Sequence, residues 1–245
     1  MKRLIIVSLL LTCANVLFAQ KVDGLDEAIN AIKSVRESAV PYGFEMKYSY
    51  ANESKPTVLL DSLNGAIVIA GKNYYCKMDS TETISNDRYN IVLFREDKIM
   101  YVGAARSDNT EDPIGQMQGV LEKSGANSCT TTYCGTKKII NVGFAAGGAC
   151  KQLKMVIDTA ARHMLSMEYL IKTAMLIDAP DAEARVAGQG YDEYAVVNAS
   201  FYNYHPFNKD TAWFNENQFF YKEGSEYKPA PAYREYQIVL ATPNL

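Results

Sequence analysis

Few residues of this chain have types and spacing that could support chemistry, and a glycine-rich stretch is the first. The stretch GFAAGGACK, from Gly143 to Lys151, has the look of a phosphate-binding loop. Such a loop needs a lysine directly after its last glycine, followed by serine or threonine, because these groups must reach the phosphates and the metal ion. Here Ala149 and Cys150 stand between Gly148 and Lys151. We therefore expect a strand end softened by glycines instead of a nucleotide site.

Two histidines, His163 and His205, are the candidates for a general base. Neither recurs with a serine, cysteine or carboxylate at a meaningful spacing, and the sequence contains no Gly-x-Ser-x-Gly and no His-Glu-x-x-His. Carboxylates gather near residues 181–193, where a pair could support hydrolysis and a solvated loop is the simpler interpretation: Asp181, Glu183, Asp192 and Glu193. No catalytic residue, metal site or cofactor is predicted, and a histidine-dependent hydrolase stays the third hypothesis.

The first 19 residues have the layout of a secretory signal peptide. Lys2 and Arg3 precede an apolar run too short to span a bilayer, and Ala19 offers a cleavage point. We expect export, followed by one domain at 20–245. A competing interpretation makes Cys13 the lipidated first residue of an outer-membrane lipoprotein, because the residues before it loosely resemble a lipobox.

Four cysteines follow the signal peptide, and an even number in an exported chain suggests disulfides with three possible pairings. We favour Cys129 with Cys134, because the intervening TTTY could form a hairpin loop that places them opposite each other. Cys76 would then pair with Cys150. The alternative is four buried thiols that act as small hydrophobes. A zinc site would want a second close pair or a nearby histidine.

Charge excludes one large class of partner. The formal net charge of the whole chain is −3, and removing Lys2 and Arg3 would leave 23 basic against 28 acidic residues, or −5. No basic patch stands out, so nucleic acid is not an expected partner. Tyrosine dominates the aromatic residues, with 17 in the chain, and it favours half-buried β surfaces with a wet edge.

One helix is predicted to lead the mature chain, over residues 23–40. Acidic residues occupy its first turn, and Pro41 and Gly43 close it. Apolar side chains recur on one helical face, which is typical of a helix that covers a core: Leu25, Ala28, Ile29, Ile32, Val35 and Ala39.

From Phe44 onward the period changes to two, which predicts strands. The runs FEMKYSYA, AIVIA, YYCKM, YNIVLFR and KIMYVGA follow one another within 44–104 with short connections. Later runs are KKIINVGFA, KQLKMVID, HMLSMEYLIKTAML, YAVVNASFYNYHPF and YREYQIVLA, and the stretch 178–190 is unassigned. Because helices and strands are not interleaved, the predicted class is α+β, mostly β, with an antiparallel sheet.

A short amphipathic helix interrupts the strands at residues 113–124. Ile114, Met117 and Leu121 lie on its apolar stripe. A curved sheet under such a helix can enclose an apolar pocket, whose mouth these three side chains would line. The other possibility is that the stripe simply covers the sheet as core.

The leading helix and the segments FEMKYSYA, LNGAIVIAGKNYYCKM, ETISNDRYNIVLFREDKIMYV, DPIGQMQGVL and AYREYQIVLA together resemble the LolA-like superfamily of outer-membrane lipoprotein carriers. The resemblance implies an unclosed, strongly curved antiparallel β-barrel plugged by short helices, an apolar cavity that accepts acyl chains, and a periplasmic location. This chain departs from the carriers in its four cysteines, its aromatic tail at 201–233 and its loop near 178–190. No residue matches the carriers' cavity arginine, so no binding residue is transferred.

Two functional hypotheses lead. The first is a non-enzymatic exported protein that binds a lipid, an acylated protein or another apolar ligand in a half-barrel cavity, with Ile114, Met117 and Leu121 as ligand-binding residues. The second is an interaction module of the envelope with a packed core and no ligand. In that case the aromatic segment 201–222, with Trp213 and Phe219, would dock a partner protein.

One strand separates the two hypotheses. Residues 66–70, AIVIA, form a continuous apolar run. Such a strand is either buried on both faces or faces a cavity on one of them.

Overall fold

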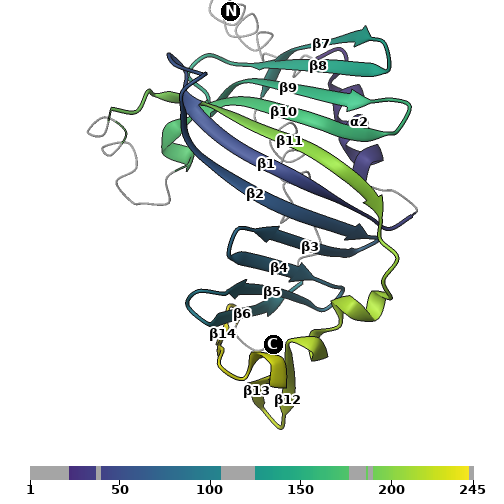
Figure 1. Ribbon diagram of the computed structural model, residues 1–245. Coiled ribbons are helices and arrows are strands. Elements are labelled where there is room, and N and C mark those ends of the chain that lie inside the picture. The colour runs from purple at the N-terminus through teal and green to yellow at the C-terminus, as the bar shows by residue number, and fades with distance from the viewer. Residues whose placement is uncertain (1–21, 37–39, 106–124, 177–185, 187–189, 243–245) are drawn as a thin grey trace, which may run out of the picture.

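The structure is a computed structural model that describes residues 22–36, 40–105, 125–176, 186 and 190–242 of the 245-residue chain (Figure 1). The predicted signal peptide and the predicted helix at 113–124, with Ile114, Met117 and Leu121, lie outside the described residues. Most of the unassigned stretch 178–190 does too. The division into a signal peptide and one domain therefore stays a prediction.

The described chain is built mainly of strands, which follow one helix. Their bounds, in chain order, are α2 (Leu25–Arg36), β1 (Tyr42–Asn52), β2 (Leu59–Ala70), β3 (Asn73–Met78), β4 (Thr81–Ser85), β5 (Tyr89–Phe94), β6 (Ile99–Ala104), β7 (Ala126–Cys134), β8 (Lys137–Phe144), β9 (Cys150–Asp158), β10 (His163–Lys172), β11 (Tyr194–Pro206), β12 (Phe220–Glu223), β13 (Glu226–Pro229) and β14 (Gln237–Leu240). Short 3₁₀ turns are η1 (Thr173–Leu176), η2 (Thr211–Phe214), η3 (Glu216–Gln218) and η4 (Pro231–Tyr233).

Twelve of these strands form one curved sheet in the order β14-β6-β5-β4-β3-β2-β1-β11-β10-β9-β8-β7 (Figure 1). The two end strands differ and do not pair with each other, so the sheet is not closed into a barrel. This confirms the predicted class and an antiparallel meander over residues 44–104, which contains one strand more than predicted, β4. One pairing departs from it, because β14 runs parallel to β6. Strands β12 and β13 form a separate hairpin.

Helix α2 covers one face of the sheet, which we call the helix face. Ala28 and Ile32 are fully buried in the core that the helix shares with β1, β2 and β8 to β11. At its first turn, Glu27 forms an ion pair with Lys138 of β8 at 2.5 Å and accepts a hydrogen bond from Thr131 of β7 at 3.3 Å. The hydrogen bond from Lys138 holds the pKa of the Glu27 carboxyl below its ordinary value. The amphipathic stripe thus sets which face of the sheet is buried here.

Strand β2 is buried on both faces. Ile67 and Ile69 lie in the core beneath α2, whereas Val68 and Ala70 contact a second core on the opposite side, which we call the reverse face. Adjacent residues of a strand point to opposite faces, so the continuous apolar run reflects two cores that meet at one strand.

The second core lies between the reverse face of β3 to β6 and the C-terminal part of the chain. Trp213 is half-buried, with its ring edge-on to Tyr75 at 4.9 Å. Phe214, Phe219 and Phe220 are buried in the same core. The aromatic segment expected to be an exposed docking surface is therefore largely packed against the sheet.

The favoured disulfides are not formed. Cys129 and Cys134 both lie in β7, where five residues of extended chain hold their Cα atoms roughly 16 Å apart, far beyond the reach of a bridge. The segment TTTY is strand interior, not a hairpin loop. Cys150 is a thiol whose Sγ donates to the carbonyl of Gln152 at 3.2 Å, so it does not bridge to Cys76.

Candidate functional site

The feature best suited to bind a ligand is an apolar part of the helix face on β3 to β6. Cross-strand partners point to the same face, so the register identifies the side chains that share it. Two rows cross these strands: Cys76, Thr83, Val92 and Tyr101 in one, and Met78, Thr81, Phe94 and Ile99 in the other. We call these eight residues the open face.

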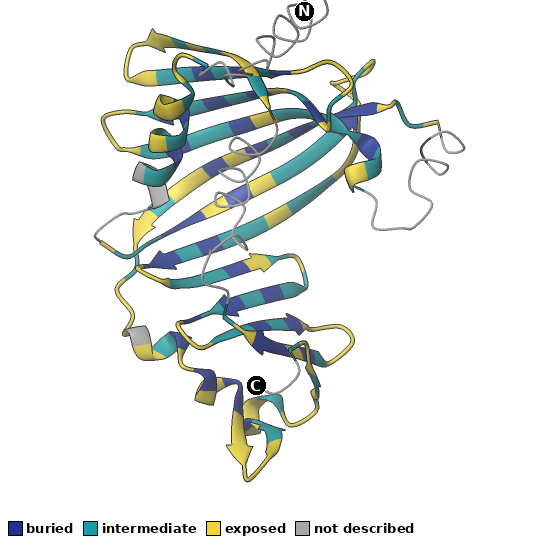
Figure 2. Cartoon of the chain, turned by 180° about the vertical axis from the view of Figure 1, so that it is seen from behind, coloured by how far each residue is buried: buried dark blue, intermediate teal, exposed yellow. Residues whose placement is uncertain are grey.

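Burial decreases across the open face toward β6. Cys76 is 8% exposed, whereas Phe94 is 37% and Tyr101 is 38% exposed. Figure 2 shows buried segments alternating mainly with intermediate ones along these strands. The rings of Phe94 and Tyr101 meet edge-on at 5.6 Å, so the two exposed aromatic side chains form one surface.

The open face carries no charge. Every charged residue of β3 to β6, namely Lys77 and Glu82, lies on the reverse face by the same register. Contact between water and such an apolar surface is unfavourable, so covering the surface with apolar groups lowers the free energy. A hydrocarbon ligand fits this chemistry, and a sugar or an ion does not.

One polar atom interrupts the apolar surroundings. Asn90 lies two residues before Val92 in β5. Its register partners are Ser85 in β4 and Gly103 in β6. Its side-chain Oδ1 is buried and has no hydrogen-bond partner within the described part of the chain. A buried acceptor without a partner is uncommon, and a bound ligand or water is one way to satisfy it.

The open face continues without a break into the core under α2. Ile67 of β2 is the register partner of Cys76, and Gly65 is the partner of Met78. A Cβ on Gly65 would lie 2.4 Å from the Met78 Sδ and 3.1 Å from the Met46 Cγ, so the glycine leaves room for two methionine side chains. Methionine is flexible and fills irregular apolar space, which suits an adaptable surface.

The histidines do not form a catalytic pair with a carboxylate. His163 stacks on Tyr204 with ring centroids 3.8 Å apart, and burial lowers the pKa of its imidazole. The Nδ1 of His205 lies 2.8 Å from the Asn203 carbonyl, and its ring covers Gly43, whose added Cβ would lie 2.7 Å from Nε2. Both rings are thus part of aromatic or backbone packing.

The other candidates from the sequence are structural as well. Strand β8 ends at Phe144, directly after Gly143, and a turn follows, as expected. The Lys151 ammonium donates to the Glu53 carboxylate at 2.8 Å and lies 3.8 Å from the centre of the Tyr194 ring. The Asp192 carboxylate accepts a backbone hydrogen bond from Ser54 at 2.7 Å, which lowers its pKa. Asp181 and Glu183 lie outside the described residues.

Sequence reasoning found β3, β5 and β6 of the open face, but neither β4 nor the face itself. The signal was the Glu96–Asp97 turn, which places Phe94 opposite Ile99 and so fixes which residues share a side. Alternation alone could not reveal that the apolar residues of β5 and β6 divide between two opposite surfaces.

Comparison with known proteins gives a fold likeness only. No family model matches the chain, and no curated protein matches it in sequence. Within the described residues, no helix has the length and apolar character needed to cross a membrane.

Three solved structures illustrate the likeness. An uncharacterized conserved protein from Thermus thermophilus has a TM-score of 0.46 at 8% identity, covering 87% of this chain and 99% of its own. A LolA superfamily protein from Nitrosomonas europaea has a TM-score of 0.35 at 6% identity, covering 78% and 97%. A putative outer membrane lipoprotein-sorting protein domain from Vibrio parahaemolyticus has a TM-score of 0.36 at 11% identity, covering 81% and 98%. These likenesses assign no ligand or residue to this chain.

Proposed function

We propose that this protein is a non-enzymatic, exported, periplasmic protein that binds a lipid, an acylated protein or another apolar ligand on the open face. The observation that supports this most directly is a surface that is apolar, uncharged and half-exposed, next to a buried core. The reverse side of the same strands is largely covered by Phe214, Phe219 and Phe220.

Binding would draw on the removal of acyl chains from water. Each buried CH₂ contributes about 0.8 kcal/mol, so a chain that buries eight of them gains roughly 6 kcal/mol before the cost of ordering it. No charged group must be desolvated on the open face, which keeps that gain.

A fluorescent fatty-acid titration tests the proposal, with native mass spectrometry of the gently purified protein as a second measurement. We expect saturable uptake and a co-purified apolar molecule. A Val92→Glu variant would place a carboxylate in the open face and should weaken binding by about tenfold or more, because the charge would have to be desolvated.

The matched control is Val196→Glu. Val196 is likewise a half-buried strand valine, but its partners Ala51 and Leu170 place it on the reverse face of β11. It should cost comparable stability and leave ligand affinity unchanged. Equal loss of binding in both variants, or no saturable uptake by the parent protein, would contradict the proposal.

The ligand-binding roles of Ile114, Met117 and Leu121 stay a prediction that the same titration can address through their serine variants. The alternative of a partner-docking module loses its main support, because Phe219 is only 7% exposed and Trp213 packs on Tyr75 and Phe207.

A further inference from the structure

A small cavity lies on the reverse face of β3 and β4, on the other side of the sheet from the open face. Its volume is about 330 Å³, within the usual range of sites for small molecules. Tyr75 of β3 and Glu82 of β4 line it from the sheet. Trp213 and Tyr233 line it from the C-terminal part of the chain, so the cavity forms only where that part meets the sheet.

The charges that line this cavity cancel each other. Among the described residues, Glu82 and Arg95 are the charged side chains of its wall. The Arg95 Nε and Nη2 donate to the two Glu82 carboxylate oxygens at 2.7 and 2.8 Å, and the Glu82 side chain is only 7% exposed. This two-point contact fixes the planes of both groups. The site therefore has no net charge to attract an ion, although its polar groups are held in place.

Aromatic rings form much of the remaining wall. Tyr75, Trp213 and Tyr233 are half-buried, so part of each ring is accessible. The Tyr75 and Trp213 rings meet at 72°, and the Phe219 and Tyr233 rings at 42°. Rings at these angles present apolar surfaces in several directions. They do not form the parallel-walled slot that a flat heteroaromatic ring would need on both of its faces.

Polar groups beside these rings offer both donors and acceptors of hydrogen bonds. The Arg95 Nη1 lies outside the ion pair, and the exposed Gln218 side chain carries an amide donor and a carbonyl acceptor. Burial raises the pKa of the Tyr75 and Tyr233 hydroxyls, so both keep their protons at neutral pH. A hydrocarbon in this cavity would leave such groups without partners, which is costly.

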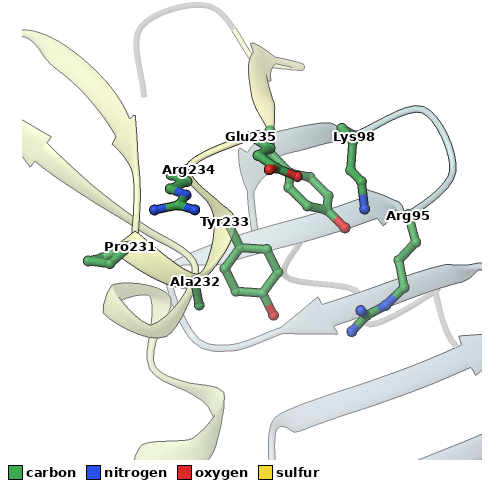
Figure 3. Close-up of a pocket in the computed structure, with 8 residues that line it drawn as sticks. Arg95, Lys98, Pro231, Ala232, Tyr233, Arg234 and Glu235 are labelled. Atoms are coloured by element: carbon green, nitrogen blue, oxygen red, sulfur yellow. The ribbon is translucent and has the colours of Figure 1, made fainter.

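A second cavity, of about 520 Å³, adjoins the first. Arg95, Ala232 and Tyr233 line both of them. Figure 3 shows the second cavity, with the Tyr233 ring between Arg234 and Arg95. One aromatic ring is thus shared by two adjoining compartments, which we call together the paired cavity. This arrangement suits a ligand made of linked rings more than a single ring.

We propose that the paired cavity binds a neutral oligosaccharide. A sugar ring has C–H groups on its faces, which pack on aromatic rings, and hydroxyls on its rim, which both donate and accept hydrogen bonds. The rings of Tyr75, Trp213 and Tyr233 supply the first kind of contact, and Arg95 and Gln218 supply the second. The site goes beyond the binding of an apolar ligand and does not depend on it, because it lies on the opposite face and uses different residues.

The fluorescence of Trp213 tests the proposal, because Trp213 is the only tryptophan of the chain and lines the cavity. The probes are maltotetraose, cellotetraose and chitotetraose, which are uncharged and differ in linkage and in acetamido groups. We expect a saturable change with at least one of them, and binding at least about threefold tighter than that of its monosaccharide. The proposal is overturned by no saturable change with any of the three, by equal affinity for the monosaccharide, or by saturable binding of adenosine alone.

Two matched pairs of variants assign the binding to this cavity. Gln218→Ala should weaken binding by about three- to tenfold, whereas Asn217→Ala, at an exposed carboxamide that lines neither cavity, should leave it unchanged. Tyr233→Leu keeps an apolar side chain in the second core but removes the ring, so it should weaken binding by about tenfold and Tyr233→Phe should lose less. Urea unfolding checks that each variant is folded, and the exposed pair decides the question if Tyr233→Leu is not. Equal effects within that pair overturn the proposal.

Discussion

Removing Arg95 should destabilise the protein through the carboxylate it leaves behind. In Arg95→Met the methylenes of the side chain are replaced, but Glu82 keeps a buried charge with neither of its two hydrogen bonds from arginine. Breaking a fully buried ion pair costs roughly 3–5 kcal/mol. The Arg95 side chain is 46% exposed, so water replaces part of the lost interaction and about 2 kcal/mol is the expected decrease in unfolding free energy.

Urea unfolding followed by Trp213 fluorescence measures this loss, because Trp213 packs in the second core beside the pair. A loss of about 2 kcal/mol corresponds to a fall in Tm of roughly 4–8 °C for a chain of this size. Lys72→Met at the exposed β2–β3 turn is the control and should stay within about 0.5 kcal/mol of the parent.

A double-mutant cycle isolates the pair from other effects of each substitution. Arg95→Met combined with Glu82→Gln should cost at least about 1 kcal/mol less than the sum of the single variants, because the neutral amide no longer needs the cation. Additive losses, or a loss below about 0.5 kcal/mol for Arg95→Met alone, would refute the assignment of Glu82 as a buried charge that depends on Arg95.

Three further outcomes are expected. Gly65→Ala should cost about 1–3 kcal/mol in urea unfolding, because its Cβ would lie 2.8 Å from a backbone oxygen of β3, whereas Gly71→Ala meets no atom and should cost only the strain of its φ of +64°. Thiol labelling under non-reducing conditions, followed by mass spectrometry, should modify the exposed Cys134 first and Cys150 only on unfolding, because burial raises the pKa of the Cys150 thiol. A Cys134 that resists labelling in the folded protein would contradict this. Burial lowers the pKa of His163 in the folded state, so the unfolded state takes up the proton first and the free energy of unfolding should fall as the pH drops through about 6.5. His163→Phe should flatten this dependence of stability on pH. An unchanged pH profile in that variant would argue against a lowered pKa for His163.

The sequence correctly predicted those elements whose own residues show the apolar periodicity of a strand or a helix. β1 alternates strictly, from Phe44 and Met46 inside to Glu45 and Lys47 outside, and α2 has its apolar stripe, so both were found. β4 was not identified as a strand of its own, because five residues with three hydroxyls show little alternation. β7 was misinterpreted because an edge strand with mostly exposed polar residues looks like a loop.

The candidate site was harder to predict than the fold for a physical reason. Whether Phe94 and Tyr101 lie on the same surface depends on the register of two strands, and register is set jointly by turn geometry and by which face is buried. Because cores lie on both faces of the sheet and both faces of β2 are apolar, the local sequence does not show which face a given side chain occupies. The pocket that Arg95 and Lys98 line together with residues 231–236 depends on segments more than 130 residues apart in the chain, which no local pattern encodes.

The parallel pairing of β6 with β14 has a consequence for how the chain acquires its structure. Strand β6 ends at Ala104 and β14 begins at Gln237, so this edge of β6 stays unpaired until residues 237–240 have been synthesised. Until then, the reverse face of β3 to β6 lacks Phe214, Phe219 and Phe220 and stays wet. Closing such a long loop is slow, and an unpaired edge beside uncovered apolar residues invites association with other chains. A nascent chain of this protein is therefore most vulnerable to association after β11 has been synthesised and before residues 214–240 follow, when most of its sheet already exists.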